Sequence, residues 1–132
     1  QLTCITPIGT GANVTMAMSV NDQLSLNFPL FTYKLPVVLS TNTLPTTGGG
    51  LTITGNNFGS LGSSAITSVK VDGVVCANPT VMIAHTTITC LTAPGVGKDL
   101  EIIVTIAEQA SITGAGKFSF SPPTVTSVNS GS

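Results

Sequence analysis

The feature that most constrains this sequence is an internal repeat with a spacing of 86 to 87 residues. The opening Thr3-Cys4-Ile5-Thr6 recurs 86 residues later as Thr89-Cys90-Leu91-Thr92. Glycine, glutamine and apolar positions keep this offset, and after one inserted residue aromatic and proline positions keep an offset of 87. The matched pairs include Gly9 with Gly95, Gly11 with Gly97, Gln23 with Gln109, Met16 with Ile102, Met18 with Val104, Phe31 with Phe118 and Pro36 with Pro123. Self-similarity at a fixed period indicates a chain built from repeated structural units.

The repeat divides the chain into about one and a half units. Residues 1–34 correspond to the second half of one unit, residues 35–121 to a complete unit, and residues 122–132 to the opening of a third. Pro36 and the pair Pro122-Pro123 mark the junctions, because proline ends ladder pairing and stiffens a short linker. The sequence therefore predicts a tandem array of small domains.

Within the complete unit, short segments rich in β-branched residues alternate with glycine, asparagine and proline turns. The predicted strands cover 51–54, 69–71, 74–77, 87–91, 100–107 and 117–121. The turn Asp72-Gly73 between two of them is a strong hairpin signal. About seven short strands without a helical period indicate an antiparallel β-sandwich. Phe58 and Phe118 are expected to be its largest core side chains.

Composition excludes several classes of function. Charged residues make up only 7% of the chain, with four Lys, no Arg and a formal net charge of −1, so a nucleic-acid surface is not expected. No apolar run approaches the ~18 residues of a membrane-spanning segment. No signal peptide is recognisable, and we expect the given chain to be mature, processed or excerpted. A surface this poor in charge is expected to be covered by glycans or by neighbouring protein.

Four segments of the complete unit carry a family resemblance: Gly48 to Gly59, Val71 to Cys76, Thr87 to Gly95, and Phe118-Ser119-Phe120. Together they resemble the IPT/TIG family, immunoglobulin-like domains found in plexins, hepatocyte-growth-factor-type receptors, Rel-type transcription factors and amoebozoan cell-surface adhesion proteins. The resemblance implies an all-β, immunoglobulin-like sandwich of the E-set type in tandem repeats. Residues 122–128 look like the first strand of another such domain. A small departure is Thr92-Ala93-Pro94, where the family usually runs straight from Thr to Pro.

The resemblance also implies a disulfide between Cys76 and Cys90. Such a bond implies an oxidising, extracellular compartment and contributes ~3 kcal/mol by restricting the unfolded chain. Cys4 corresponds to Cys90 at the repeat offset of 86 residues, and we call such corresponding residues repeat-mates. Its disulfide partner is therefore expected about fourteen residues upstream, before residue 1, or in another chain. A zinc site is not expected, because Cys-x-x-Cys does not occur and His85 is the only histidine.

The sequence supports neither catalysis nor a cofactor. His85 is expected in a solvent-exposed loop, and Ser or Cys nucleophiles lack another plausible base. The acids Asp72, Asp99, Glu101 and Glu108 are interpreted as solvated charges rather than a calcium site. The glycines at 48–50 do not form a phosphate loop, since neither Lys-Ser/Thr nor a helix follows them.

One modification motif is present. Asn13-Val14-Thr15 is an N-glycosylation acceptor, whereas Asn78-Pro79-Thr80 is not, because Pro occupies its middle position. The Ser- and Thr-rich stretches 40–47 and 124–132 are candidates for O-linked sugar on composition alone. Heavy glycosylation is a physical route to solubility for a chain whose mean hydropathy is +0.49.

Two functions fit these observations, and neither is enzymatic. One is a cell-surface adhesion or receptor module that binds another protein. The other, which we favour, is a structural subunit that self-assembles into a fibre or repeat array. In the second reading an inter-subunit strand would pair head to tail with residues 1–34 of the next subunit; its residues are Thr124, Val125, Thr126, Ser127 and Val128. The expected partners are thus the chain itself or another cell-surface protein, with covalent glycans. A third class, an accessory domain of a carbohydrate-active enzyme, lacks the exposed aromatics that such domains use.

Overall fold

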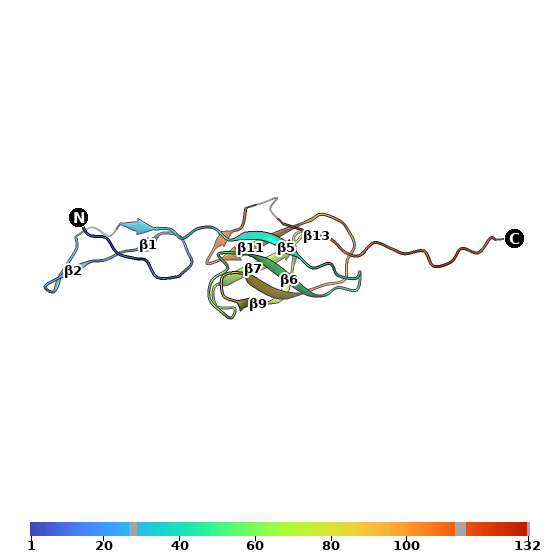
Figure 1. Ribbon diagram of the computed structural model, residues 1–132, viewed down its shortest axis with the longest axis horizontal. Coiled ribbons are helices and arrows are strands. Elements are labelled where there is room, and N and C mark those ends of the chain that lie inside the picture. Colours follow the sequence, from blue (N-terminus) through green and yellow to red (C-terminus); the bar gives the residue numbers. More distant parts are fainter. Residues whose placement is uncertain (27–28, 113–115, 132) are drawn as a thin grey trace.

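The computed structural model describes residues 1–26, 29–112 and 116–131, and the central part of the chain is a two-layered β-sandwich. Every ladder between its strands is antiparallel (Figure 1). The first sheet has the order β5-β6-β10-β9, with β5 (Val37–Thr41), β6 (Gly49–Asn56), β10 (Thr87–Thr92) and β9 (Ala77–Ile83). The prediction of an antiparallel all-β sandwich is therefore confirmed.

The second sheet is built around β11, which pairs with three of its other strands. Its order is β12-β11-β7-β8, and β13 pairs with β11 as well. The bounds are β7 (Ile66–Val71), β8 (Val74–Val75), β11 (Leu100–Ile106), β12 (Gln109–Ala110) and β13 (Lys117–Phe118). The described residues contain no helix long and apolar enough to cross a membrane.

The core lies between the two sheets and follows from the alternation along their central strands. Leu51 and Ile53 of β6 point inward, and Ile102, Val104 and Ile106 of β11 do the same; all five are almost fully buried. Each such side chain stabilises the fold by about 1.5–3 kcal/mol when it leaves water. The largest fully buried side chains are those predicted, Phe58 and Phe118.

The predicted hairpin turn is confirmed in detail. Asp72 and Gly73 have φ of 48° and 80°, the two positive values that a two-residue turn between strands with right-handed twist requires. Gly55 is needed for a different reason. Its φ is not in the positive region, but a Cβ there would overlap the carbonyl oxygen of Val37 and the ring of Phe58.

One predicted strand, 74–77, is wrong in its extent. The structure ends β8 at Val75 and begins the longer strand β9 at Ala77. Pro79 lies within β9, and its missing N–H is tolerated because β9 is the edge of its sheet. Two residues of β9 face the single residue Cys90 of β10 at this point, which is a β-bulge.

Residues 1–34 form two small ladders beside the sandwich, to the left of it in Figure 1. Their strands are β1 (Val14–Thr15), β2 (Ser19–Val20), β3 (Gln23–Leu24) and β4 (Leu30–Phe31). β1 pairs with β4 as β11 pairs with β13, and β2 pairs with β3 as the end of β11 pairs with β12. The registers agree when the sequence offset is applied: Val14↔Phe31 corresponds to Leu100↔Phe118, and Val20↔Gln23 corresponds to Ile106↔Gln109.

The C-terminal residues 121–131 extend away from the sandwich and form no strand (Figure 1). Val125 and Val128 are 81% and 84% exposed. The inter-subunit strand at 124–128 is therefore unpaired in this chain, and its role stays a prediction.

Candidate functional site

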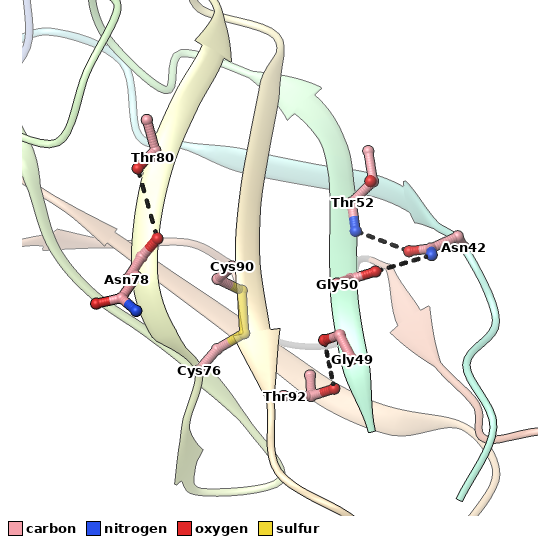
Figure 2. Close-up of a disulfide and its surroundings, with 9 residues drawn as sticks. All are labelled: Asn42, Gly49, Gly50, Thr52, Cys76, Asn78, Thr80, Cys90 and Thr92. Carbon is pink, nitrogen blue, oxygen red and sulfur yellow. Dashed lines mark hydrogen bonds between the residues drawn. A yellow bond between two sulfur atoms is a disulfide. The ribbon is translucent and has the colours of Figure 1, made fainter. Parts of the chain in front are cut away.

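The disulfide joins the two cysteines that the resemblance predicts. Cys76 lies between β8 and β9, and Cys90 lies in β10; the sulfur atoms are bonded, and both residues are buried (Figure 2). Their Cα atoms are 5.6 Å apart, within the range in which a disulfide needs no backbone movement. The bond lies where the chain passes from β8 of the second sheet to β9 of the first. At this point the bulge interrupts the pairing of β9 with β10, and the disulfide holds the two together.

Side-chain hydrogen bonds secure the end of β6 next to this bond (Figure 2). The Asn42 side chain accepts from Thr52 N–H at 2.7 Å and donates to the Gly50 carbonyl at 3.2 Å. Thr92 Oγ1 donates to the Gly49 carbonyl at 3.1 Å. Gly48 has φ of 79°, and a Cβ there would lie 2.5 Å from the Thr92 carbonyl oxygen. Gly48 thus serves the tight turn that leads into β6, which begins at Gly49.

The remaining candidate residues lie apart from one another. Cys4 is exposed and forms no disulfide within the described residues. Asn13 is exposed at a turn with φ of 53°, and its N–H donates to Thr32 Oγ1 at 3.2 Å. An exposed acceptor is sterically open to a glycan, but the modification stays a prediction. Across the described residues, no group of His, Cys, Asp and Glu is arranged to hold a metal ion.

His85 differs from its prediction. It lies in the turn between β9 and β10, as expected, but is half-buried rather than exposed. Its N–H donates to the Gly59 carbonyl at 2.7 Å, and its own carbonyl accepts from Phe58 N–H at 3.2 Å. These backbone bonds hold the turn with His85 at φ 64°, so the residue serves local structure here.

The exposed apolar face of residues 1–34 is the most unusual surface of the described chain. Met16, Met18 and Val20 are 37%, 45% and 63% exposed, although their repeat-mates Ile102, Val104 and Ile106 are buried. The difference has a simple cause. β11 is covered by the first sheet, whereas nothing in the described residues covers the corresponding face of β1 and β2.

At the described positions, the backbone of this segment repeats that of residues 95–112 and 116–120 closely. Four residues in each copy have positive φ at matched positions: 111°, 53°, 47° and 62° at Gly11, Asn13, Asn21 and Asp22, against 133°, 56°, 44° and 65° at Gly97, Asp99, Ala107 and Glu108. Non-glycine residues adopt such values rarely, so chance agreement at four places is not expected.

Hydrogen bonds and ring contacts repeat as well. Ser25 N–H donates to the Met18 carbonyl as Ser111 N–H donates to the Val104 carbonyl, at 2.7 and 2.8 Å. Tyr33 N–H donates to the Gly11 carbonyl as Phe120 N–H donates to the Gly97 carbonyl, both at 2.9 Å. The rings of Phe31 and Tyr33 meet edge to face at 4.7 Å between centroids, and those of Phe118 and Phe120 do so at 4.8 Å.

A contact joins residues 1–35 to one end of the sandwich, and we call it the joint: Thr10, Gly11, Tyr33 and Leu35 on one side, Asn57, Gly59, Ala107 and Gln109 on the other. Asn57 Nδ2 donates to the Leu35 carbonyl at 2.9 Å, and Gln109 Nε2 donates to the Tyr33 carbonyl at 3.3 Å. Gly59 lies so close to the Thr10 methyl group that a Cβ would be 3.1 Å from it. The joint was not predicted from the sequence. The one sequence feature that pointed to a shared role for Gln109 was its match with Gln23 at the repeat offset.

The opposite end of the sandwich carries the repeat-mates of the first side of the joint. Val96, Gly97, Phe120 and Pro122 correspond to Thr10, Gly11, Tyr33 and Leu35. They border an open hollow whose other walls include Pro45, Thr46 and Pro123. The C-terminal end of the sandwich therefore carries, at the corresponding positions, the side of the joint that residues 1–35 contribute at its N-terminal end.

Comparison with known proteins agrees with the fold. The sequence model of the IPT/TIG domain family matches residues 36–120, which span the whole sandwich from the residue before β5 to the residues after β13. A search of curated proteins gave no match. The chain therefore belongs to the IPT/TIG family of non-enzymatic, immunoglobulin-like domains.

Proposed function

We propose that this chain is an extracellular structural module, one of a series of IPT/TIG-like units that act through contact with each other rather than through chemistry. The disulfide supports an oxidising location, because such bonds persist outside the cytosol and are rare within it. The low share of charged residues supports a surface that is covered by sugar or by protein.

The observation that carries the proposal is the joint. Two side-chain hydrogen bonds and a close glycine contact fix how residues 1–35 meet the next unit, and the positions that correspond to the first side of the joint border a hollow at the far end of that unit. If each unit meets the next through this surface, the contact is head to tail. Head-to-tail contacts generate an open array when the rotation from one unit to the next does not close into a ring.

The exposed C-terminal segment supports continuation of the series. Its residues 124–128 have the spacing of β5, and Val125 is the repeat-mate of Val38, a core side chain that is 1% exposed. A segment with this pattern can add as a strand to a neighbouring sheet. Such a strand would supply only the counterpart of β5 to the incomplete unit at residues 1–34. The other missing strands of that unit would have to come from the same neighbour. We propose that units joined in this way assemble into a fibre.

A second candidate, binding of a different cell-surface protein, has its own support. Apolar side chains are exposed along the edge strands β8 and β9, where Val74, Val75, Met82 and Ile83 are each more than half exposed. Exposed edges with apolar side chains are common sites of protein contact. This surface is separate from the joint, so both activities can coexist.

The test is to image the protein from its native source by negative-stain electron microscopy and to run it on a denaturing, non-reducing gel. Strings or filaments of evenly spaced globular units are the expected result. The gel then distinguishes a fibre of short subunits, near 13.3 kDa plus sugar, from one continuous chain of many units. Discrete particles with a single unit each would contradict the array and leave binding of another protein as the function.

A further inference from the structure

The structure indicates what would cover the exposed apolar face of residues 1–34, because the corresponding face of the complete unit is covered within the same chain. Val14, Met16, Met18, Val20 and Phe31 are the repeat-mates of Leu100, Ile102, Val104, Ile106 and Phe118. In the complete unit these positions pack against residues of β5, β6, β7 and β10, in one cluster of buried side chains. The matched registers, φ values and hydrogen bonds mean that residues 11–26 and 29–33 already hold the conformation that this packing needs. Residues 1–6, the counterpart of β10, form no strand and would have to pair with the occupant.

Cys4 provides independent evidence for the same missing segment. Its repeat-mate Cys90 is bonded to Cys76, fourteen residues earlier in the chain. Cys4 itself is exposed and has no such partner within the described residues. A segment that covered the open face in the manner of residues 35–86 would bring a cysteine to Cys4 as Cys76 is brought to Cys90.

We infer that the open face of residues 1–34 is a docking surface for the first half of a second IPT/TIG unit, which carries a cysteine that bonds to Cys4. The occupant has the strand pattern of residues 35–86. This inference rests on the proposed array and deepens it, since it makes residues 1–34 part of a full unit. Formation of the Cys4 disulfide from two thiols releases two protons and two electrons, which a disulfide oxidant of an oxidising, extracellular compartment takes up; the covering of the apolar face needs no oxidant.

The rest of the chain favours this occupant over its own C-terminal segment. In the complete unit β5 pairs with β6 and not with β11 or β13. Residues 124–128 of a second copy can therefore replace β5 only, and they would leave the positions that face β6, β7 and β10 uncovered. They also contain no cysteine to bond to Cys4.

The inference can be tested by construction. Residues 35–86 are duplicated and fused directly before Gln1 of the full chain, which restores the natural spacing of the repeat. Methionine oxidation by peroxide is followed by peptide mass spectrometry. We expect the oxidation of Met16 and Met18 to slow by about tenfold or more, because buried side chains react only through rare local openings. Met82, which is exposed on β9, is the internal reference and should keep its rate.

Thiol content gives a second, separate readout. The parent chain should show one alkylatable thiol, Cys4, and the fusion none. A matched fusion with Cys76→Ser in the added copy should restore one thiol while keeping Met16 and Met18 protected. The substitution Met18→Asp should leave the parent's thermal transition unchanged but abolish the protection of Met16 in the fusion.

Three results would overturn the inference. In the first, the fusion keeps an intact Cys76–Cys90 bond in its original unit, yet Met16 and Met18 oxidise at the parent's rate and Cys4 stays free. In the second, a fusion that carries a flexible linker of equal length protects the methionines equally well. In the third, the parent alone protects them at high concentration, and removal of residues 123–132 abolishes this protection. The third result would identify the C-terminal segment of a second copy as the occupant.

Discussion

Removal of the Cys76–Cys90 disulfide should be the most damaging change that leaves the apolar core in place. The bond closes a loop with a sequence separation of 14 residues. A loop of this length restricts the unfolded chain by about 3 kcal/mol at 25 °C. The double substitution Cys76→Ala and Cys90→Ala should lower the free energy of unfolding by about this amount, with a small further loss from the space the sulfurs vacate.

Urea unfolding followed by far-ultraviolet circular dichroism is the suitable assay, because the chain has no Trp and its single Tyr33 lies outside the sandwich. For a domain of this size the thermal midpoint should fall by about 12–24 °C, at ~4–8 °C per kcal/mol. Reduction of the parent should reproduce the loss, and Cys4→Ala should not change the stability because Cys4 is exposed and unbonded here. A loss below ~1 kcal/mol for the double variant would refute the loop-closure reasoning.

Four further predictions test other parts of the structure. Gly48→Ala should destabilise the fold more than Gly73→Ala, by at least ~1 kcal/mol in urea unfolding, because both have φ near 80° but only Gly48 lies against a carbonyl; equal losses would show that the close contact does not matter. Asn42→Ala should cost about 1–2 kcal/mol in the same assay, since it breaks two hydrogen bonds that hold β6, and Asn42→Asp should recover only the one from Thr52 N–H. Asn13→Gln should abolish an enzymatically removable glycan in protein from a secreting eukaryotic host, whereas an identical mass before and after would mean that Asn13 is unmodified. Asn57→Ala combined with Gln109→Ala should broaden the distance distribution in small-angle X-ray scattering, relative to the exposed control Lys70→Ala, because it removes both hydrogen bonds of the joint; an unchanged distribution would mean that the joint is held by other contacts.

Much of the sandwich could be predicted because its signals are local. Alternation over 51–54 and the Asp72-Gly73 turn each depend on a few neighbouring residues, and both were correctly interpreted. Strand β9 was not predicted beyond Ala77; it contains Pro79, and a strand tolerates proline there only if it lies at the edge of its sheet. That position is a property of the whole fold and leaves no trace in a short window of sequence.

The repeat allowed a different kind of prediction, in which the role of a residue is inferred from the corresponding residue one period away. It identified Cys4 as the counterpart of Cys90, and the structure repeats registers and hydrogen bonds later in the same segment, from Gly11 to Tyr33. The joint could not be predicted in this way, because Asn57 and Gln109 bond to backbone carbonyls, which every residue carries. His85 was misjudged for a related reason: backbone bonds to Gly59 and Phe58, which a sequence pattern does not reveal, draw its turn against the sandwich.

The most direct test of the account is a disulfide map of the protein from its native source, made by alkylation under non-reducing conditions, digestion and mass spectrometry. The account predicts that Cys76 is linked to Cys90 and that Cys4 is linked to a cysteine of another IPT/TIG first half. Cys4 recovered as an alkylated thiol would contradict the series of complete units. Alkylated thiols at Cys76 and Cys90 as well would contradict the extracellular location.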